Sequence, residues 1–125
     1  MVISPSWDTA LGDSILLAES TLYRIANNED YGATIYPRRE DTFRAFVECP
    51  FENVKVVIVG QDPYPGKGPR GEPFAHGMAF STTCCNIPAS LKNIFHELSK
   101  EYGLPPRKNP NLTDWAHQGV LLLSM

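Results

Sequence analysis

The run from Val54 to Val59 constrains the fold of this chain more than any other feature of its sequence. It reads Val-Lys-Val-Val-Ile-Val, so five of its six residues are β-branched. Such a run is typical of a parallel strand that is buried on both faces of a sheet. The run stops at Gly60, and the chain is rich in glycine and proline from there to Gly77. A long loop therefore leaves the carboxyl end of the strand, which is the edge where open α/β sheets bind their ligands.

Two helices are expected between this strand and a second one. The first helix begins at Ser90, a suitable N-cap residue, and ends at Gly103. Its apolar positions follow the 3.6-residue period: Leu91, Ile94, Phe95 and Leu98. A shorter helix around Trp115 ends at Gly119, and a second buried strand runs from Val120 to Leu123. Strands that alternate with helices predict an α/β fold.

Helical periodicity also marks the first part of the chain. From Ser6 onward, apolar residues recur at steps of three and four along one helical face: Leu11, Ile15, Ala18, Leu22 and Ile25. Gly12 is the weak point of this helix. Asp41 is expected to cap a second, shorter helix that ends before Pro50. We therefore interpret the first fifty residues as a helical lead to the α/β core.

The length of the chain leaves room for a single domain. The chain has 125 residues, and domains usually have about 100–200. We expect one domain over residues 1–125, with the helical lead at 1–50 and the α/β core at 51–125. Open sheets usually have about 4–6 strands, whereas only two strands are predicted here. The predicted fold is thus a central parallel sheet flanked by helices and incomplete at the C-terminus, as in the N-terminal part of a larger domain.

Charge and cysteine content exclude several kinds of site. Eleven Lys and Arg residues against 14 Asp and Glu residues give a formal charge of -3. Proteins that bind nucleic acid through bulk electrostatics are usually basic, so DNA binding here would require a local site. The three cysteines are too few for a four-cysteine zinc or iron–sulfur site, and their odd number does not indicate a disulfide framework. The spacing of the three histidines fits no metal-binding motif, so we expect no metal.

The sequence shows no feature of a membrane or secreted protein. No apolar stretch approaches the ~18 residues of a membrane-spanning helix, and residues 1–8 lack the basic flank and apolar block of a signal peptide. We expect an intracellular monomer with no membrane partner. It would be cytoplasmic in a prokaryote, and would lie in the nucleus or a viral factory in a eukaryote or a virus.

Three side chains that can take part in chemistry stand at the start of the long loop. Gln61, Asp62 and Tyr64 directly follow the end of the first strand. An aspartate before Pro63 also favours turn initiation, so a purely structural Asx turn is the alternative interpretation. On the functional interpretation, a carboxylate, an amide and a tyrosine ring share the ligand-binding edge of the sheet.

Five segments of the chain, taken in order, resemble the family-1 uracil-DNA glycosylases. They are Thr34–Pro37 with Phe43–Phe46, Gln61–Tyr64, Gly77–Ser81, Pro88–Ile94 and Trp115–Leu123. Their order and rough spacing agree from Thr34 to the end, so the resemblance covers most of the chain. It implies a base-excision repair hydrolase that removes uracil from DNA without a cofactor, after the base is flipped out of the stack.

The resemblance also implies roles for residues after the first strand. Asp62 would orient or deprotonate the attacking water and stabilise the cationic sugar. Gln61 would contact the flipped uracil. Tyr64 would occupy the space that the 5-methyl group of thymine needs. Phe80 would stack on the uracil ring, and the alternative for this residue is a core aromatic.

Further roles follow for the helix after the loop and for the end of the second strand. Pro88 and Ser90 would contact DNA, with Ser90 donating to a phosphate at a helix N-terminus; Ser90 as a helix cap only is the alternative. Ser124 stands where the family has a base-reading asparagine. A serine hydroxyl has one donor and cannot form the same two-point contact. The implied partners are uracil-containing DNA and a protein inhibitor or replication protein.

The chain departs from the family pattern in other places as well. Pro65 replaces the usual histidine, as it does in a viral branch of the family, and the loop from Gly66 to His76 is longer than usual. The family's later His-Pro-Ser segment has no counterpart in these residues, so we expect the 125 residues alone to excise uracil inefficiently. A non-catalytic module of the same fold that binds DNA or a replication protein is the alternative function.

Overall fold

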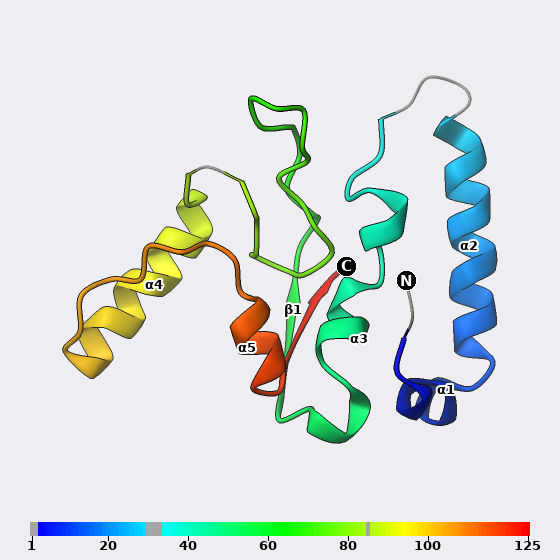
Figure 1. The fold of residues 1–125 in the computed structure, drawn as a ribbon, viewed down its shortest axis with the longest axis horizontal. Coiled ribbons are helices and arrows are strands. Elements are labelled where there is room, and N and C mark those ends of the chain that lie inside the picture. The colour runs from blue at the N-terminus through cyan, green and yellow to red at the C-terminus, as the bar shows by residue number, and fades with distance from the viewer. Residues whose placement is uncertain (1–2, 30–33, 85) are drawn as a thin grey trace.

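The computed structural model describes residues 3–29, 34–84 and 86–125. Within these ranges the chain forms helices, two short 3-10 helices and two strands (Figure 1). In chain order they are α1 (Pro5–Leu11), α2 (Ser14–Glu29), η1 (Arg39–Asp41), α3 (Arg44–Glu48), η2 (Phe51–Asn53), β1 (Val56–Gly60), α4 (Ala89–Tyr102), α5 (Thr113–His117) and β2 (Val120–Ser124). In Figure 1, α2 and α4 stand at opposite sides of the molecule, and the strand pair lies between them.

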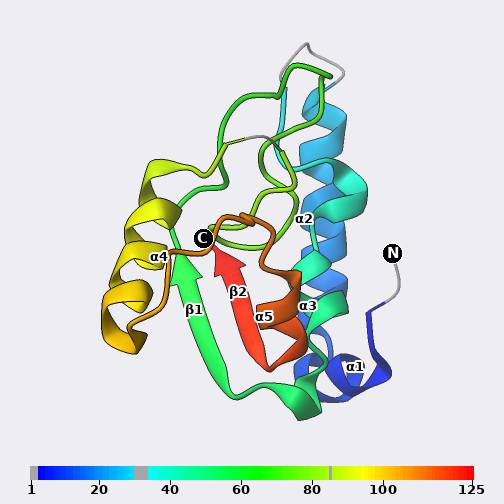
Figure 2. The ribbon, with the colours of Figure 1, turned by 60° about the vertical axis from the view of Figure 1, so that its left-hand side comes forward.

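The two strands pair in parallel and end at the same level. Their register runs from Val56 beside Val120 to Gly60 beside Ser124. Figure 2 shows both arrows pointing toward the long loops. Because the carboxyl ends are level, the loop that leaves β1 begins next to the residue that ends β2. This arrangement confirms the predicted parallel α/β core.

The core lies around β2 and joins the helical lead to the α/β part of the chain. Five of its most deeply buried side chains come from α4, α5, β2 and the segment before α5: Leu91, Phe95, Leu112, Ala116 and Leu122. On the other side, the Trp7 indole Nε1 donates a hydrogen bond of 2.9 Å to the Cys49 carbonyl oxygen. The rings of Phe46 and Phe51 meet the Trp7 ring edge-on. Helix α1 is thereby attached to the segment that leads into β1.

The helix predicted from Ser6 to Ile25 is in fact two helices. Gly12 follows α1 with a φ of 53°, a conformation that side-chain-bearing residues rarely adopt. The chain turns there and starts again as α2. Much of the apolar surface of α2 is solvent-exposed, including Leu16 and Leu17. No helix among the described residues is long and apolar enough to cross a membrane.

Both predicted side-chain caps are wrong. Asp41 lies in η1, and its carboxylate accepts hydrogen bonds from the Arg44 guanidinium at 2.6 and 3.1 Å. Helix α3 therefore begins without a side-chain cap. Ser90 lies inside the first turn of α4, and Pro88 occupies the N-cap position. The C-terminal prediction is confirmed, because Gly103 closes α4 in the left-handed conformation.

The prediction that β1 is buried on both faces is also wrong. Val57 and Val59, which share one face of the strand, are 53% and 58% exposed. No described element covers this face. The apolar run therefore indicates a strand correctly but does not indicate how deeply that strand is buried.

Candidate functional site

A pocket of about 640 Å³ opens at the carboxyl ends of the two strands. Its wall combines the end of β1 and the loop that follows it, the segment around Phe80, and the end of β2. The segment from η1 to α3 also lines the pocket. The pocket therefore lies at the edge of the sheet where the sequence predicted ligand binding.

Backbone hydrogen bonds hold the entrance of the long loop against the end of β2. The Met125 amide donates to the carbonyl oxygens of Gly60 and Gln61, both at 3.2 Å. The side chains of Gln61 and Asp62 remain exposed and line the pocket. An exposed carboxylate beside a pocket is accessible to water and to a ligand at the same time.

Tyr64 holds the segment that forms the far wall of the pocket. Its hydroxyl donates a hydrogen bond of 2.8 Å to the Phe80 carbonyl oxygen, and it lies 3.5 Å from the Ser90 hydroxyl. Burial raises the pKa of the Tyr64 hydroxyl, and the contact with Ser90 lowers it to a smaller extent. The tyrosine is thus neutral and acts as a hydrogen-bond donor.

Phe80 has an unusual backbone conformation for a residue with a side chain. Its φ is 66°, in the left-handed region, which costs about 1–3 kcal/mol and persists only where neighbouring contacts hold it. Its ring lies over the end of β1, because a Cβ atom added to Gly60 would meet the ring carbon Cε2 at 3.4 Å. The same Cβ would lie 3.2 Å from that of Ala79. Glycine at position 60 therefore leaves the space that the aromatic ring occupies.

The residues just before Phe80 are attached to two other elements. The Ala79 amide donates to the Leu122 carbonyl oxygen of β2 at 3.1 Å. The Ala45 amide of α3 donates to the Gly77 carbonyl oxygen at 3.2 Å. A Cβ at Gly77 would lie 1.8 Å from the Asp41 carbonyl oxygen, so only glycine allows this close approach. The aromatic wall of the pocket is therefore built on a fixed backbone.

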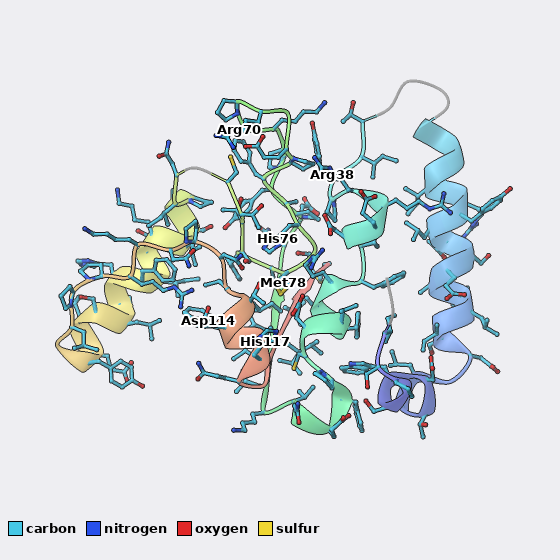
Figure 3. All side chains as sticks on the ribbon, viewed as in Figure 1. Arg38, Arg70, His76, Met78, Asp114 and His117 are labelled. Carbon is cyan, nitrogen blue, oxygen red and sulfur yellow. The ribbon has the colours of Figure 1, made fainter. Side chains whose placement is uncertain are left out.

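A buried polar network lies behind this wall. His76 is 7% exposed and Ser81 is fully buried. The His76 Nε2 atom lies 2.7 Å from the Ser81 hydroxyl oxygen, and the Leu112 amide donates to that same oxygen at 2.8 Å. Burial lowers the pKa of the His76 imidazole, and the nearby charge of Arg44 lowers it further. Figure 3 shows His76 between the tip of the loop, marked by Arg70, and the interior around Met78.

The structure brings together six of the seven candidate residues that were named from the sequence. They all line the pocket: Gln61, Asp62, Tyr64, Phe80, Ser90 and Ser124. Pro88 lies outside this lining, at the N-cap of α4. The other two histidines are elsewhere: His96 is exposed on α4, and His117 contacts Glu48 at 2.6 Å near the amino end of β2.

Several lining residues were not foreseen from the sequence. Arg39, Thr42 and Phe43 come from the helical lead and face the pocket. Their segment shows only short helical periodicity, and nothing in it indicates that it faces the end of a strand more than 15 residues later. His76 carried no signal either, because a single histidine in a loop has no pattern that separates a buried role from an exposed one.

The side chains that line the pocket determine the chemistry that this site can support. An aromatic ring and apolar side chains can hold a planar ligand, while the amide of Gln61 and the hydroxyl of Ser124 can form directional hydrogen bonds. The Asp62 carboxylate can accept a proton from water or stabilise a positive charge. The described residues contain no group of three or more His, Cys, Asp or Glu side chains that could hold a metal ion.

Comparisons with known proteins give a consistent result. No family model matches the chain. Over 103 residues, 82% of its length, the chain is 48% identical to the uracil-DNA glycosylase of Mycoplasmopsis pulmonis, and it covers 44% of that protein. It is also 48% identical over 104 residues to the uracil-DNA glycosylase of Phocaeicola vulgatus, of which it covers 45%. The chain thus spans somewhat less than half the length of these curated relatives.

Solved structures agree with the sequence comparison. The crystal structure of mimivirus uracil-DNA glycosylase matches 98% of this chain with a TM-score of 0.82 and 32% identity, and 46% of that structure is covered. A variant of the mimivirus protein in complex with UGI matches with a TM-score of 0.83 and 31% identity, over 98% of this chain and 47% of that one. These matches confirm the predicted fold class and the family resemblance.

Proposed function

Because the chain belongs by sequence and fold to the uracil-DNA glycosylase family, we propose that it removes uracil from DNA by hydrolysing the bond between the base and the deoxyribose. The observation that carries this proposal is the meeting of Asp62, Tyr64 and Phe80 at one pocket. A base inside a DNA duplex is stacked, so the target nucleotide must turn outward to reach such a pocket. The exposed entrance beside Gln61 and Asp62 is where it would enter.

The pocket supplies both affinity and selectivity for uracil. Stacking on Phe80 contributes about 1–3 kcal/mol, and every pyrimidine could gain it. Selectivity must therefore come from other groups. The Tyr64 ring fills the space next to the base where a 5-methyl group would lie, which rejects thymine. The Gln61 amide and the Ser124 hydroxyl, at adjacent strand ends, are available to hydrogen-bond the polar edge of the base.

Asp62 performs the chemical step in this proposal. Its carboxylate orients a water molecule and accepts a proton from it as the water oxygen forms a bond to C1′. The bond between C1′ and the base nitrogen breaks at the same time, and its electrons leave with the uracil anion. The negative charge of Asp62 also stabilises the positive charge that develops on the sugar. General base catalysis of this kind typically contributes about 10²–10⁴ in rate.

Contact with the DNA backbone is assigned to the start of α4. Ser90 is exposed in the first turn of this 14-residue helix, whose N-terminus favours a phosphate group without requiring a net positive protein. The mimivirus relative has been solved in complex with UGI, and we include such a protein inhibitor among the partners proposed for this chain. An inhibitor that covers the carboxyl edge of the sheet would block the pocket.

The proposal is tested by measuring which base the chain releases. Oligonucleotides that are identical except for one uracil, thymine or cytosine are incubated with the protein, and the free base is identified by mass spectrometry. Alkaline treatment then cleaves the strand wherever a base has been lost. We expect release from the uracil oligonucleotide alone. Binding of that oligonucleotide without any release would contradict the enzyme and support a non-catalytic module instead.

A further inference from the structure

The uracil pocket contains a buried support that the proposed reaction does not itself use. We propose that His76 is a positioning residue, which accepts the Ser81 hydroxyl proton and thereby holds Phe80 in the orientation needed for stacking on the base. The expected effect on base binding rests on the proposed function, whereas the hydrogen bonds that support the inference do not depend on that function. The basis is the chain of contacts from His76 Nε2 to Ser81 Oγ at 2.7 Å and from the Leu112 amide to the same oxygen at 2.8 Å.

The direction of each hydrogen bond follows from the number of protons available. The Leu112 amide can only donate, so Ser81 Oγ accepts from it. Among the described residues, Ser81 Oγ has His76 Nε2 as its one other hydrogen-bond partner. The single hydroxyl proton of Ser81 must therefore go to Nε2, because a buried hydroxyl without an acceptor is unfavourable. His76 is then neutral, with its proton on Nδ1.

The surroundings of His76 favour this neutral form. Burial acts most strongly against the charged imidazolium, and the positive charge of Arg44 acts in the same direction. Asp41 and Glu48 act in the opposite direction with smaller effects. Both carboxylates are paired with the Arg44 guanidinium, at 2.6 and 3.2 Å. His76 can therefore act as a hydrogen-bond acceptor near neutral pH.

Ser81 transmits this constraint to the aromatic wall. It directly follows Phe80, whose left-handed backbone is otherwise held by the Tyr64 hydroxyl and, one residue earlier, by the bond from Ala79 to Leu122. The Ser81 amide also closes a turn onto the Met78 carbonyl oxygen at 3.2 Å. Fixing the Ser81 side chain thus fixes the far end of the turn that presents the ring.

Two variants separate this role from general packing. His76→Gln keeps an acceptor that can reach Ser81, whereas His76→Leu removes it. Their affinity is measured for a single-stranded oligonucleotide carrying 2′-fluoro-2′-deoxyuridine, a nucleotide that resists cleavage. We expect His76→Leu to bind about tenfold more weakly, which corresponds to the lower end of the contribution of one base–aromatic stack. His76→Gln should retain most of the affinity, and the matched surface change His96→Leu should have no effect.

A double-mutant cycle shows whether His76 acts through Phe80. In a Phe80→Ala background the ring is absent, so His76→Leu should cause no further loss of affinity. Ser81→Ala provides the same test if His76→Leu does not fold. An equal loss in both backgrounds would overturn the positioning role.

The tautomer of His76 is tested without any ligand, by ¹⁵N NMR of the imidazole at neutral pH. We expect Nε2 to be unprotonated and Nδ1 to carry the proton, and a proton on Nε2 would overturn the proposal. Failure of the proposed function has a different signature, since wild-type protein would then release no base from the uracil oligonucleotide whatever the state of His76.

Discussion

Removing the Tyr64 ring tests whether it excludes thymine, and removing only its hydroxyl tests whether it holds Phe80. The hydroxyl donates to the Phe80 carbonyl oxygen at 2.8 Å, and a hydrogen bond of this kind contributes about 0.5–1.5 kcal/mol net. Tyr64→Phe should therefore lower the free energy of unfolding by about 1 kcal/mol. It keeps the ring, so it should still release no thymine.

Tyr64→Ala removes the ring as well. The side chain is half-buried, so the loss of stability should be below the 3–5 kcal/mol of a fully buried aromatic, at about 2 kcal/mol. The space it leaves accepts a methyl group, whose burial contributes about 0.8 kcal/mol. We therefore expect slow release of thymine from a thymine oligonucleotide, absent in the wild type.

Both variants are assayed by thermal unfolding and by release of base from matched uracil and thymine oligonucleotides. The Tyr64→Phe protein serves as the control for the hydroxyl contact alone. If Tyr64→Ala remains folded and releases no thymine, or if Tyr64→Phe releases as much thymine as Tyr64→Ala, the steric role of the ring is refuted.

Three further predictions follow from contacts around the pocket. Gly60→Ala places a Cβ at 3.2 Å from the Ala79 Cβ and 3.4 Å from the Phe80 ring, so it should displace the ring and weaken binding of a uracil oligonucleotide. The pKa of His76 is lowered in the folded state, so the unfolded state takes up a proton first as the pH falls. Denaturant titrations should therefore show the free energy of unfolding decreasing below about pH 6.5. The His76→Gln protein should lack this pH-dependent loss of stability. Ser124→Asn provides a second hydrogen-bonding atom at the end of β2 and should raise the preference for uracil over cytosine by about tenfold; an unchanged ratio in a base-release assay would remove Ser124 from the base-reading site.

The parts of the fold that were predicted from the sequence are those whose signals are local. The β-branched run before Gly60 and the apolar run at Val120 to Leu123 are signals of local composition, and both strands are present with the expected parallel pairing. The polar and aromatic residues at Gln61, Asp62 and Tyr64 could be placed at one edge because parallel strands end together.

The parts that were not predicted depend on competition between side-chain partners, on burial, or on contacts between residues that are distant in sequence. Aspartate is a residue type that is favoured at helix N-caps, but the Arg44 guanidinium offers the Asp41 carboxylate a stronger, charge-assisted contact. The exposure of Val57 and Val59 could not be read from their side chains, since the same residues suit a buried strand. His76 acquires its environment from Ser81 and the distant Leu112 amide, and no spacing in the sequence records that contact.

The most direct test of the central claim is the single-turnover rate of uracil release with the protein in excess over a uracil oligonucleotide. The comparison is between the wild type, Asp62→Asn and the matched control Asp13→Asn, whose exposed carboxylate lies outside the pocket lining. The described lining includes no histidine that could donate to the departing base, and one such donor is worth roughly 10²–10³ in rate, so release should be slow. We expect Asp62→Asn to lower the rate at least about 100-fold while Asp13→Asn leaves it unchanged. Equal rates for the wild type and Asp62→Asn, or no release by the wild type, would contradict the account.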